Sequence, residues 1–200
     1  MRSRHCGILL VLCVGCDPTP QPDAAFAADL MSRASQDQAQ MEALAAHWTD
    51  SAYHQQLART LVANARWLDS AVGIRGWPDR AAVGDSGADA AFLIAQHADS
   101  LPAAQRRLLE ALRAAVAAGT AKPVHLAYLE DRVRKASGHP QLYGTQVGYD
   151  AAGEAHVPEV DDPASLDRRR RAVGLPPMGE YLDTLRAVNR RMRAAQPAEP

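Results

Sequence analysis

Two long stretches without proline or glycine constrain the fold of this chain most strongly. Over residues 24–48 and 51–72, apolar side chains recur three, four or seven positions apart: Leu30, Ala34, Met41, Leu44 and Trp48, then Leu57, Leu61, Leu68 and Val72. This spacing is typical of one face of an amphipathic α-helix. Alanine is abundant and aromatic residues make up only 5% of the chain, a composition that favours close-packed helices over strands. The sequence therefore predicts a mainly α fold.

Helix breakers and caps predict five more helices, over residues 85–98, 101–118, 123–137, 164–173 and 177–195. The segment 85–98 is apolar nearly all round, so we expect it at the centre of the bundle. Gly76-Trp77-Pro78 lies in a stretch with several breakers, which predicts a loop over residues 73–84. Ser100 is expected to cap the fourth helix.

A change of period follows the fifth helix. Tyr143, Thr145, Val147 and Tyr149 alternate with other residues and would share one face of a strand. Residues 150–153 can turn that strand back onto residues 155–157. The expected architecture is a single-domain bundle of six or seven helices over residues 24–195, with one small β-hairpin near residues 141–158. Residues 196–200 would be a flexible tail.

Residues 1–15 have the features of an export signal. Arg2 and Arg4 precede ten apolar or glycine residues, a run too short for a bilayer, which needs about 20. The segment Leu12-Cys13-Val14-Gly15-Cys16 resembles a lipobox. We therefore predict cleavage before Cys16, lipid on Cys16, and a proline-rich tether over residues 16–23. The protein would be anchored in the cell envelope, facing the periplasm or the extracellular side. An ordinary cleaved signal or a misassigned start codon remains the alternative.

Composition excludes several functional classes. The three cysteines all lie within the first 16 residues, so the mature domain has no thiol for a disulfide, a metal or a nucleophile. The histidines lack paired metal-ligand spacing, and no metal or cofactor is expected. The formal net charge is -1, and removing Arg2 and Arg4 leaves -3. Nucleic-acid binders carry a basic excess instead, so the expected partners are the membrane and either a small molecule or an envelope protein.

Polar residues that fall on predicted core faces mark the candidate site. They come from four helices: Asp37, Asn64, Gln96, His97 and Asp131. Burying such groups without partners costs several kcal/mol, so they must meet one another, a ligand or water. One interpretation is a structural hydrogen-bond network. The other is a pocket in which His97 transfers protons beside a carboxylate.

Eight short segments occur in an order that points to a family. They are Asp37-Gln38, Asn64, Gly76-Trp77-Pro78, Val83-Gly84, Gln96-His97-Ala98-Asp99, Tyr128-Leu129-x-Asp131-Arg132-Val133, Gln141-x-Tyr143-Gly144-Thr145-Gln146 and Arg169-x-x-x-Val173-Gly174-Leu175-Pro176. Over roughly residues 25–190 the chain resembles the bacterial family catalogued as domain of unknown function 6624. The resemblance implies that these polar residues are the hallmark of the family, and it implies no particular activity.

The candidate roles follow from side-chain chemistry. His97 is the candidate for proton transfer, with Asp131 or Asp99 to orient it. Asp37 is a further candidate catalytic residue. Arg132 could hold an anionic group, or could pair with a carboxylate such as Glu130. Thr145 is either a nucleophile or a strand residue. The further candidate ligand-binding residues are Gln96, Asp99, Tyr143 and Gln146.

Two functions therefore remain open at this point. The first is a membrane-anchored lipoprotein with a hydrolase-like or small-ligand-binding pocket. The second is a non-catalytic envelope lipoprotein that binds a protein partner and uses the same polar residues as a structural network.

Overall fold

The computed structural model describes residues 21–150, 154–157 and 159–194. Within these ranges the chain forms seven α-helices and one small antiparallel sheet, which confirms the mainly α, single-domain prediction. The predicted signal peptide, Cys16 and the tail at 196–200 lie outside the described residues, as does all of the tether before Gln21.

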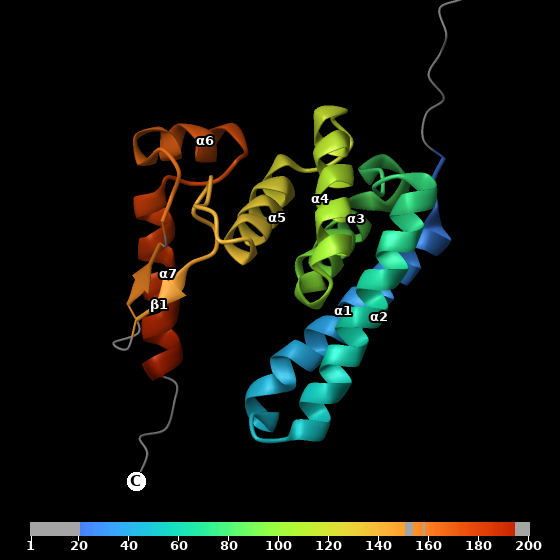
Figure 1. Cartoon of the computed structure of the whole chain (residues 1–200), viewed down its shortest axis with the longest axis horizontal. Helices are drawn as coiled ribbons and strands as arrows, with labels where there is room; N and C mark the ends of the chain where they lie inside the picture. Colours follow the sequence, from blue (N-terminus) through green and yellow to red (C-terminus); the bar gives the residue numbers. More distant parts are fainter. Residues whose placement is uncertain (1–20, 151–153, 158, 195–200) are drawn as a thin grey trace, which may run out of the picture.

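An antiparallel helix pair begins the fold. Helix α1 (Ala24–Ala43) continues through a short 3-10 turn, η1 (Leu44–His47), and α2 (Ser51–Arg75) runs back along it (Figure 1). Asp23 caps α1, because its side chain accepts a hydrogen bond from the backbone of Phe26 at 3.0 Å. Asp50 caps α2 in the same way.

Both boundaries of the loop predicted over residues 73–84 were wrong, and the loop is shorter. Helix α2 continues to Arg75, and α3 (Arg80–Gln96) already begins after Asp79, whose carboxylate caps the Ala81 backbone at 2.7 Å. Gly84 interrupts α3 with a φ of 71°, a conformation that glycine adopts without penalty. A strong cap ahead of Gly84 therefore starts the helix early, and the glycine only kinks it.

Helix α3 lies at the centre of the bundle, as its apolar composition predicted. It packs mainly against α1 and also contacts α2, α4 (Pro102–Ala117) and α5 (Pro123–Ala136). The largest fully buried apolar side chains come from five different helices: Leu30, Leu68, Ile94, Leu108, Leu112 and Leu129. Ser100 does not cap α4; Leu101 occupies that position without a side-chain bond, and Pro102 supplies the first helical residue.

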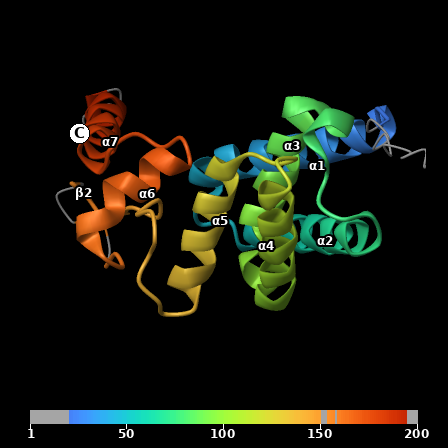
Figure 2. The ribbon, with the colours of Figure 1, turned by 90° about the horizontal axis from the view of Figure 1, so that it is seen from above.

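The C-terminal elements pack together on the far side of α5. They are the sheet β1 (Gly148–Tyr149) with β2 (Ala155–His156), the 3-10 turn η3 (Pro163–Ser165), α6 (Leu166–Ala172) and α7 (Met178–Ala194). In both ribbon views α5 separates them from α4 (Figures 1 and 2). The hairpin is confirmed near the predicted place, but the predicted strand was too long, because Tyr143 and Thr145 lie in a loop.

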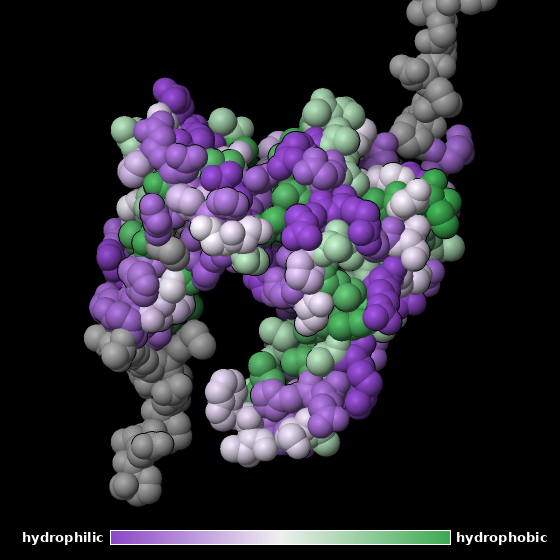
Figure 3. Space-filling view, viewed as in Figure 1, coloured by the Kyte–Doolittle hydropathy of each residue, from purple (hydrophilic) through white to green (hydrophobic). Residues whose placement is uncertain are grey.

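The molecule is hollowed on one face. Figure 3 shows a wide notch between the C-terminal elements and the far end of the α1–α2 pair, with the start of α4 and the end of α5 at its head. As for spanning segments, the described helices are all too short or too polar to cross a bilayer.

Candidate functional site

His97 and Asp37 form the centre of the candidate site. His97 ends α3, and its ring nitrogen Nδ1 lies 3.1 and 3.0 Å from the two carboxylate oxygens of Asp37 on α1. The Asp37 side chain is 1% exposed and that of His97 is 16% exposed. A carboxylate only accepts hydrogen bonds, so the hydrogen of the neutral imidazole must sit on Nδ1. The buried carboxylate therefore fixes both the orientation and the tautomer of the ring.

The other ring nitrogen of His97 faces solvent. Among the described residues no partner meets Nε2, and this atom is not one of the buried polar atoms that lack a partner. In the tautomer that Asp37 selects, Nε2 carries the lone pair. An accessible, unprotonated nitrogen backed by a buried carboxylate is the arrangement that a general base needs.

A second charged pair lies next to His97. Arg132 on α5 donates from Nε and Nη2 to the two oxygens of Asp99, at 2.8 and 2.5 Å. Burial opposes the ionisation of Asp99, but it is outweighed by hydrogen bonds from Arg132 and Gln105, by the charge of Arg132, and by the charge of His97 when its ring is protonated. The pKa of Asp99 therefore lies below its ordinary value. Asp99 is a stable anion beside the imidazole.

Gln105 is a site residue that the sequence reasoning missed. It lies in α4, is buried, and its amide donates to Asp99 and to the backbone carbonyls of Ala95 and Gln96, at 3.1 to 3.2 Å. These carbonyls lie at the end of α3, where intrahelical partners run out. Gln105 therefore ties the backbone just before His97 to the side chain of Asp99 just after it. The sequence did contain a sign of this role, because Gln105 is a polar residue on an otherwise apolar face of the helix.

The predicted partners of Arg132 need correction. Glu130 pairs with Arg113 instead, and the Arg132 fork is occupied by Asp99. A third donor of Arg132, Nη1, lies 3.4 Å from the side chain of Gln146. The guanidinium is thus already neutralised and is not an open anion site.

Asp131 does not orient His97, contrary to one of the predicted pairings. It is fully buried, and its carboxylate accepts the backbone N–H groups of Leu142, Tyr143 and Thr145 and the hydroxyl of Thr145, at 2.7 to 3.2 Å. The carboxylate accepts hydrogen bonds from backbone N–H groups that, in a strand, would bond to a neighbouring strand. This is the physical reason why residues 141–146 form a loop instead of the predicted strand.

The Thr145 hydroxyl is therefore a donor to a carboxylate and not a nucleophile poised beside His97. Two glutamines complete the loop. The Gln141 side chain is bonded to both backbone groups of Gln146, at 2.8 and 3.1 Å, and Gln146 reaches the carbonyl of Tyr128 at 3.4 Å. Gly144 has a φ of 65°, and a Cβ there would lie 2.5 Å from Met178, so the loop requires glycine.

The remaining predicted residues lie around these groups. Gln96 contributes its carbonyl to Gln105. Tyr143 is partly buried, and burial together with the charges of Glu130 and Asp131 raises the pKa of its phenol. Asn64 is buried and bonded to Arg33 through its side chain. The structure thus brings Asp37, Gln96, His97, Asp99 and Arg132 together, while Asp131, Tyr143, Thr145 and Gln146 belong to the adjoining loop.

The comparison with family models decides the membership. The model of the family of unknown function DUF6624 matches residues 22–190. This chain belongs to that family. No curated protein and no solved structure shows significant similarity to it. The match extends over helices α1 to α6 and most of α7, so the polar site and the loop around Asp131 both lie within the DUF6624 region.

The DUF6624 domain contains a second Asp–His pair that offers a useful contrast. His125 lies 3.1 Å from Asp89, its ring stacks on Phe92 with centroids 4.3 Å apart, and its other nitrogen, Nδ1, is buried without a partner. Burial lowers the pKa of His125; the charge of Asp89 opposes this effect and that of Lys122 adds to it. A buried nitrogen cannot reach a substrate, so this pair is structural.

We expect His125 to make the folded DUF6624 domain sensitive to acid. Its folded-state pKa lies below the unfolded value of about 6.5, so its contribution to stability is complete above that pH. It is lost as the pH falls, because only the unfolded chain then takes up the proton. His125→Phe, which keeps a ring on Phe92, should lose less melting temperature than the parent between about pH 7.5 and 5.5. The exposed His139→Phe should behave like the parent; equal losses in all three proteins would contradict the assignment.

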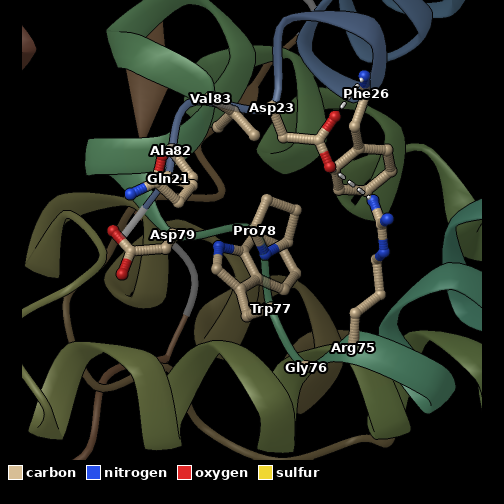
Figure 4. A pocket seen from close by; sticks show the side chains of 10 residues that line it. All are labelled: Gln21, Asp23, Phe26, Arg75, Gly76, Trp77, Pro78, Asp79, Ala82 and Val83. Carbon is tan, nitrogen blue, oxygen red and sulfur yellow. Dashed lines mark hydrogen bonds and ion pairs between the residues drawn. The ribbon is translucent and has the colours of Figure 1, made fainter. Parts of the chain in front are cut away.

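Two cavities of the helical bundle lie apart from the candidate site. A cavity of about 350 Å³ lies between α1 and α3 beside Asp89, and one of about 190 Å³ lies beside Trp77 (Figure 4). Neither is lined by His97, Asp99 or Arg132. Within the described ranges, no group of three or more potential ligands among His, Cys, Asp and Glu could hold a metal ion. The chemistry that the residues themselves offer is proton transfer.

Proposed function

We propose that this chain is a lipid-anchored protein of the cell envelope that hydrolyses an uncharged ester or amide, with His97 as the general base. The observation that carries the proposal is the hydrogen bond from His97 Nδ1 to the buried Asp37, together with the accessible Nε2. A buried carboxylate that holds a partly exposed imidazole in one tautomer is a common device for proton transfer.

The reaction needs only water besides these residues. Nε2 of His97 takes a proton from a water molecule as the water oxygen bonds to the substrate carbonyl carbon. Asp37 stabilises the imidazolium that forms. The same proton then passes from Nε2 to the leaving alkoxide or amine as its bond to carbon breaks, so that acid and alcohol or amine are released. His97 ends the cycle neutral.

The local charge favours an uncharged substrate. Asp37 and Asp99 are two anions, and Arg132, bound to Asp99, is the cation paired with them. With neutral His97 these groups carry a net charge of -1. A phosphate or carboxylate would be repelled by Asp99 and would have to displace it from Arg132. A neutral carbonyl group meets no such barrier.

The anchoring part of the proposal rests on the amino-terminal residues. The lipobox-like segment ending in Cys16 supports lipidation, and the three prolines between Cys16 and Asp23 suit an extended tether. Several acyl chains on one residue hold a protein to a bilayer firmly, whereas one chain does so only marginally.

Hydrolysis of a panel of chromogenic substrates tests the catalytic part. The panel contains uncharged acyl esters and anilides, with a phosphate monoester as the anionic comparison. We expect the purified protein to cleave an uncharged substrate and His97→Gln to lose roughly 100-fold in kcat/KM. Asp37→Asn should show a similar loss, because an amide can donate to Nδ1 and move the hydrogen to Nε2.

The matched control is His139→Gln, which changes an exposed histidine outside the site. It should retain the activity of the parent. Activity that survives in His97→Gln would refute the catalytic proposal. If the parent cleaves none of the uncharged substrates, the non-catalytic function, binding of an envelope protein, becomes the better reading of the chain.

A further inference from the structure

The chain enters the bundle at a defined end. The backbone N–H of Asp23 donates to the carbonyl of Ala82 at 3.0 Å, and the Asp23 carboxylate lies 3.0 Å from the guanidinium of Arg75. Arg75 also stacks over the ring of Phe26, 4.5 Å from its centroid. These contacts hold the start of α1 against the end of α2 and the start of α3 (Figure 4).

This end, defined here as residues 74–82 with the start of α1, exposes apolar surface. Ile74 is 86% exposed, the highest value among the large apolar side chains that the structure describes. The cavity of about 190 Å³ lies at the same end. Its walls include the apolar residues Phe26, Trp77 and Pro78, and its polar lining comprises Gln21, Asp23, Arg75 and Asp79 (Figure 4). The Ile74 side chain is the part of this end that water solvates most poorly.

The charges at this end do not oppose contact with a lipid surface. Arg75 is paired with Asp23, and Arg80 lies 3.5 Å from Asp85. Both cations sit on long apolar stems that can lie along a bilayer while the head remains in water. The two pairs are neutral together, and Asp79, whose carboxylate caps the start of α3, adds a single negative charge that sets up no strong field at the headgroups.

The geometry points to contact between this end and the bilayer that holds the lipid on Cys16; the inference rests on the proposed anchor. Asp23 lies seven residues after Cys16, a span of at most about 25 Å even when fully extended. The tether therefore keeps the residues around Asp23 close to the headgroups, whatever its conformation. Ile74 would enter the interface, and the Trp77 groove would face lipid.

Quenching of a fluorescent label by the lipid tests this orientation. The only cysteine after cleavage would be the lipidated Cys16, so one introduced cysteine can be labelled uniquely. The lipidated full chain carrying Ile74→Cys is labelled and placed in phosphatidylcholine vesicles that contain a nitroxide-headgroup lipid. The matched control is Trp48→Cys, at a residue 71% exposed. It precedes the start of α2, about 38 Å along a 25-residue helix from its other end.

We expect the label at 74 to be quenched severalfold more strongly than the label at 48. Equal quenching in a chain whose mass shows lipid on Cys16 would overturn the orientation and leave the anchor intact. If the parent chain itself carries no lipid and stays out of the membrane fraction, the anchor and the orientation fail together. Release of Cys16→Ala from that fraction is the result expected if the anchor is right. Neither result depends on the hydrolytic activity of His97.

Discussion

Replacing Asp131 with asparagine should lower the free energy of unfolding by about 3 to 5 kcal/mol. The carboxylate is fully buried and accepts three backbone N–H groups and the Thr145 hydroxyl. An asparagine has the same shape but only one acceptor oxygen, and its NH₂ group would face backbone N–H groups that are themselves donors. Buried donors without acceptors cost about 1 to 3 kcal/mol each. For a domain of this size the melting temperature should fall by roughly 6 to 20 °C.

Thermal unfolding followed by circular dichroism measures this effect. Asp183→Asn is the matched control, because its carboxylate is 77% exposed on α7; its melting temperature should stay within about 2 °C of the parent. Hydrogen exchange adds a local measurement. The backbone amides of residues 142–145 should lose protection first. A variant that melts with the parent would mean that Asp131 does not hold the loop, and the structural role assigned to it would fail.

Replacing Arg170 with methionine is expected to have a comparable effect on the C-terminal elements. Arg170 is fully buried; it donates to the carbonyls of Tyr143 and Pro176 at 2.6 and 2.7 Å, and it stacks over Tyr181 at 4.8 Å. Burial lowers the pKa of its guanidinium. Methionine fills most of the space but leaves both carbonyls without a donor. We expect a loss of about 3 kcal/mol or more, and lysine should not restore it, because one ammonium cannot replace the planar fork.

The region that loses stability distinguishes this prediction from the first. Helices α6 and α7 pack on each other and on the hairpin, and not extensively on α1 to α4. Hydrogen exchange in Arg170→Met should therefore rise mainly over residues 159–190, while α3 keeps its protection. The exposed Arg168→Met, two residues earlier, should leave both stability and exchange unchanged. Uniform loss of protection in Arg170→Met would argue against a local role.

Periodicity predicted the helices well because burial of one face determines each of them. The 24–48 and 51–72 segments and the apolar 85–98 segment all became helices of the core. Errors arose where a single side chain outweighed the pattern. Asp79 caps α3 before the glycine that was expected to end a loop, and Asp131 draws the 142–145 backbone out of a strand that alternation favoured.

The members of the site were easier to predict than their pairing. Asp37 and His97 were both recognised as polar residues on core faces, yet they are 60 positions apart in sequence. Several carboxylates were chemically equivalent partners, and only the packing of α1 on α3 selects Asp37. Gln105 and Arg170 were missed, and Gln141 was noted without a role, because their partners are mainly backbone carbonyls and amides, which carry no signature in the sequence.

The length of α1 also sets a length scale. Its first residue, Ala24, adjoins the end proposed to touch lipid, and Asp37 follows 13 positions later, which at 1.5 Å per residue is about 20 Å. With α1 upright on that surface, this length would hold the imidazole clear of the headgroup layer. Catalysis would then take place in the aqueous space beyond the lipids, on molecules that diffuse past the surface or on polymers lying parallel to it, and not on the acyl chains below.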